Sequence, residues 1–175
     1  PQNESVWYWL IPFSDGTCSL GVVGSPEFFD GLGGSLEDKM LACRLAEPAQ
    51  AKLLDKAEFI IDVRQITGFS SNVKALYGKN FALLGNAGEF LDPVFSSGVT
   101  IAFKSADLAT NLLLRRRAGE KVCWETEYSQ PLKKGVDTFR VFVDAWYDGR
   151  LQDVIFHPDV THGIQQKICS ILAGY

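Results

Sequence analysis

The stretch "FALLGNAGEFLDPVFSSGVTIAFKSADLA", residues 81–109, decides the fold. Its first four residues, Phe81 to Leu84, form an apolar run that is too short for a helix and ends at a glycine, which predicts a buried strand. Residues 85–98 are rich in Gly, Pro, Asn and Ser and predict a long turn. From Gly98 the apolar residues recur at helical spacing, and three arginines, residues 115–117, suit the negative end of the helix dipole. The unit is therefore strand, loop, helix.

The loop in this unit is a candidate binding site. A glycine-rich turn that enters a helix leaves backbone N–H groups free at the positive end of the helix dipole, where anions and electron-rich atoms bind. The residues concerned are the amide donors Ser97, Gly98 and Val99, the rigid Pro93, and Gly85 and Gly88, which leave room for a ligand. The alternative is a tight connection whose glycines serve only the backbone geometry.

Towards the N-terminus the pattern predicts sheet and then helices. Residues 6–12 and 17–23 flank Ser14-Asp15-Gly16 and predict a β-hairpin. Ser35, followed three residues later by Asp38, resembles a capping box for a helix that runs through Ala46 and that Pro48 can restart. Residues 59–63 return to strand character.

Towards the C-terminus the pattern predicts helices. Residues 121–148 predict a long helix interrupted near Pro131, and 159–173 a shorter closing one. Aromatic residues at helical spacing indicate packing rather than a pocket. These are Trp124, Tyr128, Phe139, Phe142, Trp146 and Tyr147. We expect an α+β fold in three parts: a substrate-domain sheet and helix (1–76), the strand-loop-helix motif (77–117) and a helical region (118–175).

Composition excludes several classes of protein. The net charge of −4 comes from interspersed residues of both signs and does not favour a nucleic acid or an anionic membrane as partner. No apolar run approaches the roughly 20 residues of a membrane-spanning helix. Cys18, Cys43, Cys123 and Cys169 form no C-x-x-C pair, and no signal peptide is visible, so we expect reduced thiols in the cytoplasm.

Residues 81–109 resemble the second FAD-binding motif of the flavin-dependent halogenases and their relatives, a G-D-A-x-x-F-x-D-P-x-x-S-x-G pattern. The opening "VWYWLIPFSDG", residues 6–16, is similar to the W-x-W-x-I-P motif of those halogenases through Trp7, Trp9, Ile11 and Pro12. "AWYDGRLQDVIFHP", residues 145–158, resembles the C-terminal part of the phenol and pyrrole halogenase branch.

The resemblance implies a role for each matching residue. Asn86 takes the place of an acidic residue that reaches the ribityl or phosphate region of FAD; an amide still forms hydrogen bonds but lacks the charge. Pro93 would lie near the isoalloxazine edge. The amides of Ser97, Gly98 and Val99 would meet the pyrimidine end of the flavin, and Ser97 and Gly98 also a halide ion.

Two departures from the family pattern limit the expected chemistry. Phe95 stands where the indole-modifying halogenases carry a catalytic glutamate, which favours phenolic, pyrrolic or carrier-bound substrates; Glu89 is out of register. The Rossmann G-x-G-x-x-G and the halogenase lysine, which belong to the N-terminal half of the family, do not occur here. We therefore expect a partial monooxygenase-like fold that lacks the Rossmann half, binds FAD poorly by itself and does not complete the reaction.

Other candidate site residues have structural explanations. His157 and His162 flank Asp159, but two histidines in a proline-containing loop without further ligands indicate surface rather than a metal site. Asp92, before Pro93, is more typical of a turn or cap than of a base. Residues 115–117 suit a helix C-terminus better than a phosphate site. No metal site is expected.

Three functions remain open. The first is the C-terminal part of a halogenase that uses reduced FAD, oxygen and halide, with a flavin reductase as partner and an aromatic substrate. The second keeps the flavin for hydroxylation or for alkene reduction of the geranylgeranyl-reductase kind. The third is a non-catalytic piece that self-associates as a homo-oligomer through sheet edges and apolar surface.

Trp7 and Trp9, two apart on one strand, point to one face and form either a wall between flavin and substrate or a packing surface.

Overall fold

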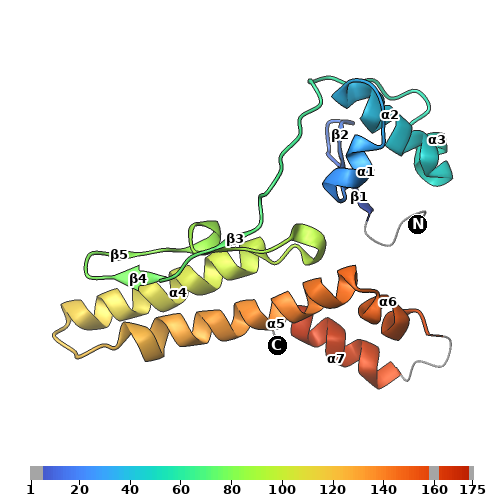
Figure 1. Cartoon of the computed structure of the whole chain (residues 1–175). Coiled ribbons are helices and arrows are strands. Elements are labelled where there is room, and N and C mark those ends of the chain that lie inside the picture. Colours follow the sequence, from blue (N-terminus) through green and yellow to red (C-terminus); the bar gives the residue numbers. More distant parts are fainter. Residues whose placement is uncertain (1–5, 158–161, 174–175) are drawn as a thin grey trace. The chain divides into compact units, whose positions relative to one another are not determined.

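The computed structural model describes residues 6–157 and 162–173. The chain divides into two compact units, residues 1–67 and residues 68–175 (Figure 1). The first contains the predicted hairpin and short helices, and the second contains the strand-loop-helix motif and the long helices. No helix in the described part of the chain is long and apolar enough to cross a membrane.

The hairpin of the first unit is confirmed. Strands β1 (Trp7–Pro12) and β2 (Cys18–Val23) pair antiparallel, with Trp9 opposite Gly21. The Trp9 indole lies over Gly21 so closely that a Cβ there would come within 1.9 Å of the ring. Its Nε1 donates a hydrogen bond to Ser19 Oγ at 3.0 Å. Trp9 is therefore held by the strand opposite it.

Three helices follow the hairpin: α1 (Pro26–Asp30), α2 (Leu36–Ala46) and α3 (Pro48–Leu53). The predicted capping box is present, because Ser35 Oγ accepts from the Asp38 N–H while Asp38 Oδ2 accepts from the Ser35 N–H. Pro48 restarts the helix as expected. Only α1 was not predicted.

The strand predicted for residues 59–63 is wrong. The segment is irregular, and Ile60 and Ile61 are 75% and 72% exposed. Apolar residues suit a strand only when another strand supplies backbone partners and a face to pack on. The hairpin of this unit contains only β1 and β2, so the segment pairs with neither.

Short antiparallel pairs begin the second unit: β3 (Ser71–Asn72) with β6 (Glu89–Phe90), and β4 (Tyr77–Gly78) with β5 (Phe81–Ala82). The strand predicted from the apolar run at residue 81 is present as β5, but it is not buried as predicted. Phe81 is 53% exposed and Leu84 is 42% exposed, because β5 is a two-residue strand in a two-stranded hairpin rather than part of a central sheet.

The helices of the second unit are α4 (Gly98–Arg117), a π-helical turn η3 (Glu125–Ser129), α5 (Gln130–Tyr147), α6 (Arg150–Ile155) and α7 (His162–Leu172). Figure 1 shows α4 and α5 side by side. Apolar residues of the strands, α4, η3 and α5 form one core. Its buried members are Leu76, Leu91, Ile101, Ala109, Leu112, Tyr128, Leu132, Val136 and Phe139.

The predicted interruption near Pro131 is the π-helical turn. Proline has no N–H for the carbonyl four residues earlier and its ring crowds that carbonyl, so a regular helix cannot pass through unchanged. Here the Gln130 N–H donates to the carbonyl of Glu125, five residues back. The widened turn buries two successive residues, Tyr128 and Ser129.

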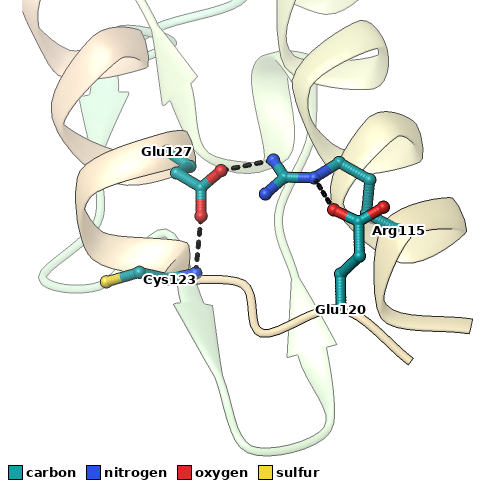
Figure 2. A network of polar contacts seen from close by, with 4 residues as sticks. All are labelled: Arg115, Glu120, Cys123 and Glu127. Carbon is teal, nitrogen blue, oxygen red and sulfur yellow. Dashed lines mark hydrogen bonds and ion pairs between the residues drawn. The ribbon is translucent and has the colours of Figure 1, made fainter. Parts of the chain in front are cut away.

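An ion-pair network joins the end of α4 to this turn (Figure 2). Arg115 Nε donates to Glu120 Oε2 at 2.9 Å, and its Nη1 pairs with Glu127 Oε2. Glu127 Oε1 accepts from the Cys123 N–H at 2.8 Å. Arg115 therefore has a structural role in the connection between the helices.

The structure contains Cys18, Cys43, Cys123 and Cys169 as free cysteines.

Candidate functional site

The loop of residues 85–98 contains two 3₁₀ turns, η1 (Gly85–Ala87) and η2 (Pro93–Phe95), on either side of β6. Gly85 has φ +52°, a left-handed conformation that favours glycine. Its N–H donates to Ser105 Oγ at 2.9 Å, and that hydroxyl donates to the Ala102 carbonyl. Because Ser105 is fully buried, the start of the loop is fixed to the second turn of α4.

The two glycines at the start of the loop lie against the chain itself. A Cβ on Gly85 would lie 3.1 Å from Ala102 Cβ, and one on Gly88 would lie 2.7 Å from Leu76 Cδ2. The space that these glycines leave is therefore occupied by neighbouring side chains. This favours the backbone-geometry interpretation of both residues.

The structure brings Asn86 and the start of α4 together. A Cβ on Gly98 would lie 3.5 Å from Asn86 Oδ1, so the amide side chain stands beside the first helical residue. The first N–H that donates within the helix is that of Ile101, to the Ser97 carbonyl at 3.0 Å. The preceding helical amides have no acceptor inside the helix. Val99 is 67% exposed, so ligand atoms can approach this end of the helix.

The turn before α4 is held by Asp92. Its Oδ1 accepts from the Val94 N–H at 3.0 Å and caps η2, while its Oδ2 accepts from the Tyr147 hydroxyl at 2.9 Å. Ser96 then adopts φ +52°, and Ser97 is buried. These contacts support the cap interpretation of Asp92. They also place the half-buried Pro93 at the first position of η2.

Glu89 is the buried carboxylate of the loop. Its side chain is 7% exposed, and Oε2 pairs with Arg140 Nη2 at 3.2 Å. Burial raises the pKa of Glu89 above its ordinary value, and the charge of Asp137 adds to the increase, whereas Arg140 and Lys133 oppose it. The effect of desolvation on the pKa of Glu89 is therefore larger than the opposing effect of the ion pair with Arg140.

We expect Glu89→Gln to change the pH dependence of stability. The raised pKa means that the folded chain binds this proton more tightly than the unfolded chain does. The contribution of Glu89 to stability is thus complete below the unfolded pKa of about 4.3 and is lost as the pH rises through the folded pKa. As the pH rises above about 4.3, the wild type should lose stability relative to Glu89→Gln. Urea unfolding at several pH values measures this, with the exposed Asp153→Asn as control; parallel curves for wild type and Glu89→Gln would contradict it.

Aromatic side chains of α5 contact the loop at Phe95. The Phe95 ring meets Phe142 edge-on at 6.3 Å between centroids and Trp146 at 6.1 Å. Tyr128 and Phe139 are buried in the core as predicted, and Trp124 packs against it. Phe142, Trp146 and Tyr147 are half-buried and belong to the surroundings of the loop. Phe95 therefore packs its ring on aromatic side chains of α5.

The tryptophans of the hairpin lie on one face. The ring centroids of Trp7 and Trp9 are 6.0 Å apart, and both side chains are half-buried. Ile11 is 51% exposed and Pro12 is exposed. These four residues belong to the first unit, whereas the loop 85–98 belongs to the second. The role of this face as a substrate wall stays a prediction.

The histidine motif is only partly within the described residues. Asp159 lies outside them. Across residues 6–157 and 162–173, no group of three or more His, Cys, Asp or Glu side chains could hold a metal ion.

Sequence reasoning missed the partners of the loop. Ser105 had a usable signal, because it is a polar residue within the buried stripe formed with Ile101, Ala109 and Leu112. Nothing in the sequence indicated the roles of Arg140 and the Tyr147 hydroxyl, since each forms a hydrogen bond with a residue more than fifty positions away. Such pairs depend on the packing of α5 against the loop.

Comparison with known proteins agrees with the motif assignment. The crystal structure of a flavoprotein/dehydrogenase from Cytophaga hutchinsonii matches 99% of this chain and 43% of its own, with TM-score 0.94 and 42% identity. The sulochrin halogenase of Aspergillus terreus is 38% identical over 67% of this chain and 22% of its own length. The 1H-pyrrole-2-carbonyl-[peptidyl-carrier protein] chlorinase of Pseudomonas fluorescens is 24% identical over 82% of this chain and 32% of its own length.

The fold is thus one found in flavoproteins, a mixed arrangement of helices and small sheets. The family model described as Tryptophan halogenase matches residues 2–168, and the chain belongs to this family. The chain spans about a fifth to a third of the length of these two curated relatives.

Proposed function

We propose that this chain supplies the flavin loop and the substrate-side hairpin of an FAD-dependent halogenase. The reaction uses reduced FAD, oxygen and a halide ion. The observation that carries the proposal is the start of α4, where the amides of Gly98 and Val99 lie without helical acceptors beside Asn86. Membership of the tryptophan halogenase family supports the halogenase form of such a site.

The residues of the loop fit one polar edge of a flavin. Backbone amides suit the electron-rich oxygen and nitrogen atoms of the pyrimidine ring, and at Ser97 and Gly98 they suit a halide ion. Asn86 can hydrogen-bond a ribityl hydroxyl. Pro93 and the capped η2 turn keep the backbone rigid where the isoalloxazine edge would lie. Bound FAD supplies the redox chemistry, and this chain binds and orients it.

The substrate we propose is a small aromatic compound, phenolic or pyrrolic, either free or bound to a carrier protein. The relative from Pseudomonas fluorescens is named for a carrier-bound pyrrole, which supports the carrier-bound case. Phe95, in place of a glutamate, supports substrates other than free indoles. A flavin reductase would supply reduced FAD in the cytoplasm. Trp7, Trp9, Ile11 and Pro12 would line the substrate side.

The test uses the full-length protein that contains this chain. With reduced FAD, oxygen and chloride or bromide, it should convert a phenol or pyrrole from a panel into a product in which halogen replaces hydrogen. Mass spectrometry identifies such a product by its isotope pattern. A protein that binds FAD and consumes reduced flavin, yet yields no halogenated product from free or carrier-bound substrates, would overturn the halogenase proposal.

A second candidate is a flavin redox reaction without halogen transfer. The structural relative with 42% identity is described as a flavoprotein/dehydrogenase, and this observation favours the candidate. Hydroxylation adds oxygen to the product, and alkene reduction adds two hydrogens. The same mass measurement therefore separates both reactions from halogenation.

A further inference from the structure

Three polar side chains of η3 and α5 reach the loop or Leu83, two residues before it. The Tyr128 hydroxyl donates to the Leu83 carbonyl at 2.5 Å, Arg140 Nη2 pairs with Glu89 Oε2 at 3.2 Å, and the Tyr147 hydroxyl donates to Asp92 Oδ2 at 2.9 Å. The first target precedes the loop, and the other two lie at successive points along it. We call Tyr128, Arg140 and Tyr147 together the α5 clamp.

Two members of the clamp lie beside the buried stripe of α5. Arg140 follows the buried Val136 by four residues, and Tyr147 follows the buried Val143 by four, so both half-buried residues border the face that packs inward. Tyr128 lies in the π-helical turn and is fully buried. The apolar contacts of this face hold the helix in place, and the three polar groups then fix the loop relative to it.

Two members of the clamp, Arg140 and Tyr147, restrain the loop beyond the point at which Ser105 of α4 holds it. Ser105 of α4 fixes the loop at Gly85. Further along, Glu89 and Asp92 both bind α5. Asp92 is the cap of η2, and η2 leads through Ser96 to the first amides of α4. The Tyr147 hydroxyl therefore acts on those amides through Asp92.

We propose that Tyr128, Arg140 and Tyr147 are positioning residues, which hold the loop 85–98 in the shape that presents its amides to flavin and halide. The assignment rests on the proposed function in one respect only, namely that flavin and halide bind at this loop. The geometry on which the clamp acts is a property of the chain itself, so it can be tested without a ligand.

The first test measures amide hydrogen exchange in the 175-residue chain by mass spectrometry. Tyr147→Phe removes the hydrogen bond to Asp92 and Tyr128→Phe the one to Leu83, and each should speed exchange in peptides from residues 83–98 by about two- to tenfold. Exchange in the second half of α4 should not change. The matched control is Thr138→Val, which removes an exposed hydroxyl of α5 that donates to the Lys134 carbonyl of its own helix. If both tyrosine variants exchange like Thr138→Val, the clamp does not hold the loop.

The second test uses the full-length protein with bound FAD. Tyr147→Phe should shift the visible flavin spectrum and raise the KM for halide more than it lowers kcat, because the amides are displaced while the reacting groups remain. Arg140→Lys should retain more of the wild-type KM than Arg140→Met. A loop that exchanges faster while spectrum and KM stay unchanged would reduce the clamp to a structural role and overturn the positioning proposal. A protein that binds no FAD refutes the proposed function, while the exchange result still decides whether the clamp holds the loop.

Discussion

Gly85→Ala should destabilise the second unit by roughly 2–5 kcal/mol, from backbone strain and from crowding. At φ +52° an L-residue pays about 1–2 kcal/mol of strain. The new methyl group would also lie 3.1 Å from Ala102 Cβ and 3.3 Å from its Cα, so helix α4 itself must move. Overpacking of this kind costs about 1–3 kcal/mol. The measurement is urea unfolding followed by far-ultraviolet circular dichroism.

Gly119→Ala is the matched control for this substitution. Gly119 has φ +88°, but a Cβ there would meet no atom within 4 Å. It should therefore show the backbone strain without the crowding. Equal losses in the two variants would mean that the approach of Gly85 to α4 is unimportant, and that the start of the loop tolerates a side chain.

Leu112→Ala should cost about 2–5 kcal/mol of unfolding free energy, since truncating a buried leucine removes transfer energy and leaves a cavity. Leu112 is 2% exposed in the middle of the core of the second unit. Its neighbour Leu113 is 50% exposed on the same helix. Leu113→Ala should change stability by no more than about 0.5 kcal/mol. The same urea measurement compares them, and similar losses would mean that α4 does not bury the predicted face.

Local patterns predicted the elements whose causes lie within a few residues. The hairpin follows from alternating residues around Ser14-Asp15-Gly16, and α2 from a cap whose two partners are three positions apart. The break before Pro131 follows from the missing N–H of proline. In each case the residue that causes the structure lies close in the sequence to the residues that it affects.

Prediction failed where the partner is distant. Residues 59–63 have strand composition, yet a strand also needs a neighbouring strand, which composition does not reveal. The burial of Phe81 was overestimated for the same reason. At the loop, the structure places Asn86 beside Gly98, whereas the motif gave no indication of that neighbour, of Arg140 or of the Tyr147 hydroxyl.

The π-helical turn has a consequence for how one helix serves several neighbours. In a regular α-helix successive side chains point about 100° apart, so the residues that face a neighbour recur every three or four positions and form one stripe along the helix. At η3 the wider winding turns both Tyr128 and Ser129 inward at the end that contacts α4. Beyond it, α5 keeps its regular stripe as far as Tyr147. The extra residue acts as an angular offset, so that the start of the helix turns two successive residues toward α4 while the remainder keeps a regular stripe that contacts both α4 and the loop.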